Sequence, residues 1–98
     1  MATKLLLGDL WCTQRSLKRD YQIEALVAAI KDGQELPRIS IRIGPDDEAD
    51  IHNGHHRATA YFLAGRTWLE PEEYDYFFSD RPSRRFWRLK EALWMPAL

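Results

Sequence analysis

The clearest pattern in the sequence is an apolar stripe of helical period in the first third of the chain. Four apolar residues fall at positions i, i+3, i+4 and i+7, namely Ile23, Leu26, Val27 and Ile30. This spacing places them on one face of an α-helix. Asp20 is suited to cap the start of that helix, and Gly33 is suited to the position just after its end.

Alternation of apolar and polar residues predicts strands elsewhere. Isoleucines alternate with Ser40 and Arg42 over residues 39–43, which is typical of a half-buried strand with one solvated face. A turn at 44–47 and a short strand at 49–52 complete a hairpin. Weaker signals predict a strand at 4–10, followed by a connecting loop, and a strand at 74–78.

Two further helices are expected. The segment 55–63 follows Asn53-Gly54 and ends before Gly65, with Ala58, Tyr61 and Phe62 as its core face. After a turn at 80–83, the segment 84–93 also has apolar residues at helical spacing. The predicted order is strand, helix, strand, strand, helix, strand, helix. We therefore expect a single mixed α/β (α+β) domain over 1–98, with a short mixed sheet flanked by about three helices.

The composition fits a folded domain of modest size. Of the 98 residues, 45% are hydrophobic, and Trp, Tyr and Phe contribute four each, which excludes a disordered chain. No apolar run approaches the length of a membrane span. The single cysteine, Cys12, excludes an internal disulfide framework and a cysteine-based zinc site. These features predict a cytoplasmic protein that does not enter a membrane.

The net charge of −1 argues against a strongly basic protein that coats DNA, but the charges are unevenly spread. Four acidic residues lie in each of the segments 45–50 and 70–75, which we expect to be solvated loops. Five basic residues lie in 81–90. Arg84, Arg85 and Arg88 are thus the solvated face of an amphipathic helix, a surface for a nucleic-acid backbone, or a surface for a protein partner.

The segment most indicative of chemistry is 51–61, where a short strand ends at Asn53-Gly54 and a helix begins at once. The first N–H groups of a helix lack intrahelical partners, and its N-terminus carries partial positive charge, so it attracts anions. Arg57 adds a bidentate donor for phosphate, and His55 and His56 add imidazoles that donate hydrogen bonds or carry protons. Gly54 would let a phosphate approach the backbone. These residues predict a phosphate- or nucleotide-binding site.

The same stretch resembles the signature helix of the ParB/sulfiredoxin-like superfamily. The residues that carry the resemblance are Asn53-Gly54-His55-His56-Arg57-Ala58-Thr59-Ala60-Tyr61, followed by Ala64-Gly65. Upstream, the expected helix to Gly33 and the segment 36–41 are similar to the helix, turn and strand of that superfamily. The resemblance covers residues 5–66. Residues 67–98, a strand followed by a basic and aromatic helix, remain unmatched.

The resemblance implies a phosphate group held by Gly54, His55, His56 and Arg57, with Arg15 assisting more weakly. Members of the superfamily include sulfiredoxins, partition proteins, ParB-like nucleases and kinases of small molecules. His55 stands where sulfiredoxins carry their catalytic cysteine, so that chemistry is not expected. Too few residues follow for the DNA-reading domain of a partition protein. A bound nucleotide could bring Mg²⁺ held mainly by its own phosphates.

Catalysis is left open by the sequence. Asn53 stands where kinase-like members often carry Asp, and an amide cannot act as a general base. His56 is then the first choice as proton carrier and His55 the second. Asp9 and Asp50 are further candidates for the base. A metal site formed by the three histidines is not expected, because the first of them, His52, falls on the predicted strand.

Three functions are consistent with these features. The leading one is a protein that binds a nucleotide or other phosphate, with or without phosphate hydrolysis or transfer. The second is a nuclease or regulator that binds nucleic acid through the helix start and the basic tail. The third is a non-enzymatic adaptor, such as a phage-encoded one. In that case the aromatic segment 68–78, otherwise core, would bind a partner or a second copy of the chain.

Overall fold

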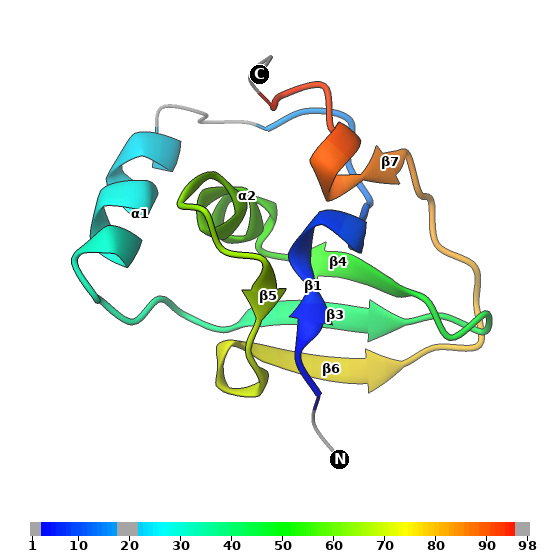
Figure 1. The fold of residues 1–98 in the computed structure, drawn as a ribbon. Coiled ribbons are helices and arrows are strands. Elements are labelled where there is room, and N and C mark those ends of the chain that lie inside the picture. Colours follow the sequence, from blue (N-terminus) through cyan, green and yellow to red (C-terminus); the bar gives the residue numbers. More distant parts are fainter. Residues whose placement is uncertain (1–2, 18–21, 96–98) are drawn as a thin grey trace.

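The computed structural model describes residues 3–17 and 22–95, which form a small mixed α/β domain as expected. Its centre is a five-stranded sheet in the order β6-β3-β4-β2-β7 (Figure 1). The strands are β2 Trp11–Cys12, β3 Ile39–Ile43, β4 Ala49–Asn53, β6 Tyr74–Phe78 and β7 Trp87–Arg88. The pairs β3–β4 and β2–β7 are antiparallel, whereas β3–β6 and β2–β4 are parallel. The predicted hairpin and the predicted strand at 74–78 are thus confirmed.

A second, two-stranded ribbon pairs β1 (Leu5–Leu6) with β5 (Trp68–Leu69). The predicted continuous strand at 4–10 is wrong, because a 3₁₀ turn, η1 (Leu7–Asp9), interrupts it before β2 begins. Leu7 and Leu10 are both buried in the core. Residues three apart point to opposite faces of a strand but to the same side of a 3₁₀ turn, so the turn allows both to be buried.

The helix α1 (Gln22–Lys31) carries the predicted stripe, whose four residues are all half-buried. It ends as expected at Gly33, where φ is +78°. The N–H of Gly33 donates to the carbonyl of Ile30 at 3.1 Å and that of Gln34 to Ala29 at 3.0 Å, the two bonds of a Schellman motif. The predicted cap, Asp20, lies outside the described residues.

The helix α2 (His55–Leu63) has the predicted bounds and packs beside α1 on the sheet (Figure 1). Ala58 and Tyr61 are buried, and Phe62 packs against the same core, so the predicted core face is confirmed. Gly65 follows with φ of +91°. Throughout the described ranges, no helix has the length and apolar character needed to cross a bilayer.

The third predicted helix, at 84–93, is wrong. The chain there forms β7 and a 3₁₀ turn, η3 (Leu89–Glu91). The N–H of Phe86 donates to the carbonyl of Cys12 at 3.0 Å, and that of Leu89 donates to Leu10 at 2.8 Å. These pairings complete the edge of the sheet, and tertiary pairing overrides a weak helical period. Leu89 and Ala92 are still buried, which explains their helical spacing.

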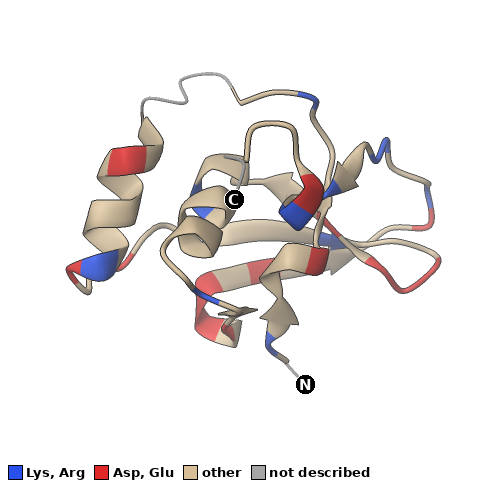
Figure 2. Ribbon diagram, turned by 45° about the horizontal axis from the view of Figure 1, so that its top comes forward, with Lys and Arg blue, Asp and Glu red and all other residues tan. Residues whose placement is uncertain are grey.

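Charged residues are also less solvated than the sequence suggested. Asp50, expected in a solvated loop, is only 1% exposed, and its Oδ2 accepts hydrogen bonds from the Nε atoms of Arg42 and Arg85 and from Ser83 Oγ. Arg42 is itself buried, so the predicted solvated face of β3 is wrong at that position. The acidic turn between β3 and β4 lies beside the basic chain that leads to β7 (Figure 2), and Asp46 in the turn pairs with Arg85 in that chain.

Candidate functional site

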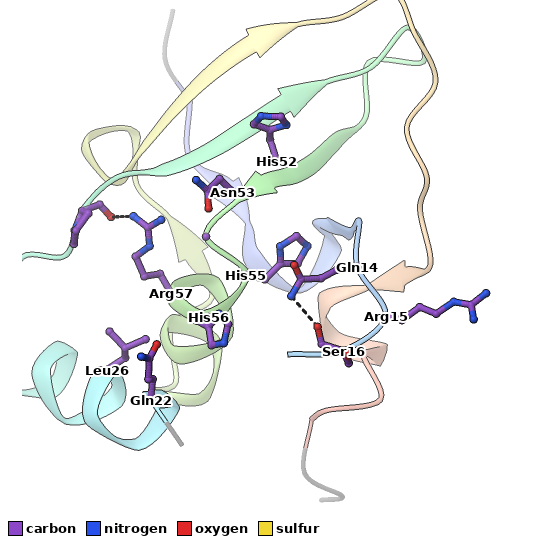
Figure 3. A pocket seen from close by; sticks show the side chains of 12 residues that line it. Gln14, Arg15, Ser16, Gln22, Leu26, His52, Asn53, His55, His56 and Arg57 are labelled. Carbon is purple, nitrogen blue, oxygen red and sulfur yellow. Dashed lines mark hydrogen bonds between the residues drawn. The ribbon is translucent and has the colours of Figure 1, made fainter. Parts of the chain in front are cut away.

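A cavity of about 720 Å³ opens at the N-terminus of α2 (Figure 3). Its walls come from the end of β4, the first turn of α2, the chain after β2 and the start of α1. The residues that line it are Gln14, Arg15, Ser16, Gln22, Leu26, Pro37, His52, Asn53, Gly54, His55, His56 and Arg57. The structure thus brings the predicted residues 54–57 and Arg15 to one cavity.

Gly54 is the turning point between β4 and α2. Its φ is +108°, and its carbonyl accepts the first helical bond, from the N–H of Ala58 at 2.9 Å. An added Cβ would come within 3.3 Å of the side chains of Arg57 and Ile39. Glycine is therefore required by the left-handed backbone and by close packing. As a glycine, the N-cap residue offers no side chain of its own to cap α2. The first N–H groups of α2 are not used within the helix, as at any helix start.

Arg57 is held across the start of α2. Its Nη1 donates to the carbonyls of Pro37 and Arg38 at 2.8 and 2.7 Å. Its Nη2 lies close to Gly54. A Cβ added to that glycine would be 3.2 Å from this nitrogen. The guanidinium is thus oriented by the chain before β3, and its Nε and Nη2 donors remain for a ligand.

His55 is buried, with 5% of its surface exposed. Its Nε2 accepts a hydrogen bond from the backbone N–H of Thr13 at 3.0 Å, and its ring packs edge-on against Trp94. Burial and the neighbouring His56 lower the pKa of His55 to about 4, although Asp50 opposes this. His55 is therefore neutral near pH 7 with its proton on Nδ1, and its Nε2 is already used.

The other two histidines lie differently. His56 is half-buried and lines the cavity on the first turn of α2. His52 is exposed on β4, where its ring packs edge-on against Phe77 at 5.0 Å between ring centroids. Among the described residues, no three His, Cys, Asp or Glu side chains come together in a way that could hold a metal ion.

Arg15 reaches the cavity only in part. Its guanidinium carbon lies 5.3 Å from the centre of the Phe86 ring, and Figure 3 shows the side chain directed away from Arg57 and His56. This cation–π contact holds the charge at the rim. Arg15 would have to rotate about its side-chain bonds to contact a phosphate at the start of α2.

The cavity has a distinctive charge character. None of the described residues that line it is acidic, although the chain contains 15 acidic residues. A second cavity, of about 560 Å³ beside the C-terminal end of α1, is lined by Glu35, Glu72 and Glu73 as well as two arginines. The first cavity therefore suits an anion much better than the second.

The basic tail lies elsewhere and is largely neutralised within the chain. Arg85 forms ion pairs with Asp46 at 2.6 Å and Asp50 at 3.3 Å. Arg88 pairs with Glu48 at 3.1 Å. Arg84 is exposed. None of these arginines lines the cavity at α2. The two proposed surfaces for anions are thus separate, and the tail has less free charge than its sequence suggests.

The sequence did not single out the residues that support the site from a distance. Thr13 fixes His55, and its Oγ1 donates to the carbonyl of Ile51 at 2.6 Å. Trp94 packs on His55 and donates to Thr59 Oγ1 at 3.0 Å. These contacts join segments 35 to 42 residues apart, so no local pattern could have revealed them. The polar run Thr13 to Ser16 was the one available signal.

Comparisons with known proteins define the fold but not the activity. No family model matches the chain, and no curated protein matches it. The chain is similar to the crystal structure of protein Atu1540 from Agrobacterium tumefaciens, with a TM-score of 0.60 and 19% sequence identity. The match covers 76% of this chain and 39% of the length of that protein. At this identity the likeness shows a shared fold alone, and the resemblance to the ParB/sulfiredoxin-like superfamily stays a prediction.

Proposed function

We propose that this protein binds a phosphate-bearing ligand, a nucleotide in the first instance, in the cavity at the start of α2. The observation that carries the proposal is a cavity at the start of α2 with an oriented arginine, Arg57, and with no acidic residue among its described lining residues. Helix N-termini favour anions through free N–H groups and through partial positive charge. The resemblance of residues 53–65 to a superfamily of phosphate-binding domains supports the same conclusion.

The shape of the cavity supports a ligand larger than inorganic phosphate. Pockets for small molecules typically measure 300–1,000 Å³, and this one has about 720 Å³. Arg57 and the start of α2 lie on one wall and Arg15 lies at the rim, while Gln14, Ser16 and Gln22 add neutral polar groups to the lining. A nucleotide, which combines charged phosphates with a larger neutral part, fits a lining that offers both kinds of group.

Arg57 is the central binding residue in this proposal. Its bonds to Pro37 and Arg38 fix the guanidinium before a ligand arrives, which reduces the entropy lost on binding. A planar guanidinium forms parallel hydrogen bonds to two phosphate oxygens. Arg15, at the rim, would close over the ligand from the opposite side.

Hydrolysis or transfer of the phosphate would need a proton carrier and a metal ion. His55 is poorly suited to carry a proton, because its Nε2 bonds to Thr13 and its pKa is near 4. The role falls to His56, on the cavity wall. The described lining residues contain no carboxylate, so Mg²⁺ would be held by the phosphates themselves with amide oxygens such as that of Asn53.

The proposal is tested by the thermal unfolding midpoint of the protein with pyrophosphate, ADP, ATP or CTP, each with and without Mg²⁺. A ligand that binds only the folded state raises the midpoint as its concentration rises. We expect a rise for wild type and for Arg84→Ala, the matched control that removes an exposed arginine elsewhere. Arg57→Ala should weaken binding about tenfold or more, as expected for a lost charge-assisted contact.

Calorimetric titration of the folded variants separates binding from stability, since Arg57→Ala also removes two bonds to the chain before β3. Equal affinities of wild type and Arg57→Ala would overturn the assignment of Arg57. The absence of binding by every ligand in wild type would overturn the proposed function itself.

A further inference from the structure

The strand β6 forms a free edge of the five-stranded sheet. The sheet order ends at β6, and no strand within residues 3–17 and 22–95 pairs with its outer side. Its five residues pair regularly with β3, from Ile39 opposite Tyr74 to Ile43 opposite Phe78. The other edge strand, β7, has only two residues. An edge of this length presents a row of backbone N–H and C=O groups to another chain.

Aromatic side chains extend the core face of the sheet out to this edge. Because β3 and β6 run parallel in register, Tyr76 and Phe78 share a face with Ile41 and Ile43. Ile41 is fully buried, yet Tyr76 is 44% exposed and Phe78 is 73% exposed. A cavity of about 240 Å³ lies between this edge and the first residues of β1, lined by Thr3, Leu5, Ile43, Tyr74, Tyr76 and Phe78.

The usual protection of an edge strand is missing here. Edge strands are typically kept from pairing by lysines, prolines or bulges. β6 contains no lysine or proline, and its pairing with β3 has no bulge. Its single charge, Asp75, forms an ion pair with Arg38 at 3.0 Å. The strand is therefore largely aromatic and regularly paired on one side, and its outer side has no partner strand among the described residues.

We propose that two copies of this chain pair through their β6 strands, antiparallel about a twofold axis at Tyr76, to form a homodimer with one continuous sheet. Charge complementarity favours a second copy as the occupant. Glu70 and Glu72 precede the strand, as does Glu73, which already pairs with Arg66, whereas Arg81 and Arg84 follow it with one acid, Asp80. Antiparallel pairing of two copies brings the acidic start of one strand beside the more basic end of the other.

The register follows from the aromatic residues. With the axis at Tyr76, this residue faces its own copy, and Tyr74 faces the partner's Phe78. Cross-strand aromatic pairs are among the more favourable contacts in antiparallel sheets. This arrangement covers the cavity beside β1 and hides Phe78. The dimer leaves the cavity at α2 open, because none of its lining residues belongs to β6.

The first test is the molar mass in solution, measured by sedimentation between about 1 µM and 1 mM protein, the range of weak association. We expect a mass that rises towards that of a dimer. Tyr76→Lys places a charge at the centre of the interface and should raise the dissociation constant about tenfold or more. The control, Leu93→Lys, makes the same kind of change at a residue that is 79% exposed outside the strand, and should dimerise as wild type does.

A crosslinking test fixes the register. Tyr76→Cys places two thiols opposite one another across the axis, so mild oxidation should give a disulfide-linked dimer, whereas Leu93→Cys should not. The natural Cys12 does not interfere, because it is buried and burial raises its pKa to about 12. Wild type that stays monomeric up to 1 mM, or equal crosslinking of both variants, overturns the proposal.

Discussion

The imidazole Nε2 of His55 accepts a hydrogen bond from the backbone N–H of Thr13 at 3.0 Å. The same threonine donates through Oγ1 to the carbonyl of Ile51, on β4. These two bonds hold the chain after β2 against the start of α2, and that chain forms one wall of the candidate site. The wall therefore depends on an imidazole that stays neutral, since a protonated Nε2 cannot accept a hydrogen bond.

Stability should fall in mild acid because of His55. Its pKa is about 4 in the folded state, against about 6.5 for an unperturbed histidine. The unfolded chain then binds more protons than the folded one between these values. The contribution of His55 to the free energy of unfolding is therefore fully present above pH 6.5. It is lost as the pH falls to 4, and the loss amounts to at most about 3 kcal/mol. Urea unfolding at a series of pH values measures this loss.

The variant His55→Gln isolates the effect, because it offers an amide oxygen as acceptor but does not titrate. Its free energy of unfolding should vary less between pH 6.5 and 4 than that of wild type. His52→Gln serves as the matched control, since His52 is exposed, and it should follow wild type. An identical pH profile for His55→Gln and wild type would show that His55 is not the responsible group.

Gly54 should tolerate substitution much less well than Gly33. Both have positive φ, +108° and +78°, which costs an alanine roughly 1–2 kcal/mol. An added Cβ at Gly54 would also crowd Ile39 at 3.2 Å, whereas nothing lies within 4 Å of one at Gly33. Gly54→Ala should therefore lose about 1 kcal/mol or more beyond the loss in Gly33→Ala. Equal unfolding free energies in urea would argue against close packing at the turn.

The sequence predicted the elements whose patterns are local. α2 and its end at Gly65, the Ile39–Ile43 strand and the stop at Gly33 depend on spacing and on glycine, and all were found where expected. The segment 84–93 could not be predicted in this way. Its apolar period is real, but its N–H groups pair with Leu10 and Cys12, more than 70 residues earlier. Local propensity carries no information about such a partner.

The candidate site shows the same limit. The residues 54–57 were enough to predict the helix start, because glycine is among the residues favoured at the N-cap and this preference can be read from neighbouring residues alone. The burial of His55 could not be foreseen, since it results from Trp94 packing on the ring and Thr13 bonding to Nε2. Likewise, Arg15 lines the cavity, but its contact with Phe86 could not be foreseen, because it depends on how the last third of the chain returns to β2.

Asp50 should be one of the most sensitive positions in the fold. Its carboxylate joins Arg42 on β3 to Arg85 and Ser83 on the chain before β7, and it is almost fully buried. Removing one member of a buried ion pair leaves the others uncompensated and typically costs about 3–5 kcal/mol. Asp50→Ala should therefore lower the unfolding free energy by an amount in this range.

The matched control is Asp75→Ala, which removes an aspartate whose ion pair with Arg38 is exposed. Exposed pairs contribute about 0–1 kcal/mol, so this variant should unfold nearly as wild type does. Similar losses in the two variants would mean that the Asp50 cluster is no more stabilising than a surface pair.

Binding to DNA through the tail is expected to be weak. Arg85 and Arg88 are occupied by Asp46, Asp50 and Glu48, and an arginine already paired releases no counterion from a phosphate backbone. Fluorescence anisotropy with a labelled duplex should thus show little binding and little change between 50 and 200 mM salt. Arg84→Gln should change neither the affinity for the duplex nor its salt dependence. Arg85→Gln should instead lower the free energy of unfolding, because it removes the ion pairs with Asp46 and Asp50. The opposite result would be tight binding whose affinity falls about a thousandfold over this salt range, with a smaller salt dependence in Arg85→Gln. It would show that the tail binds nucleic acid.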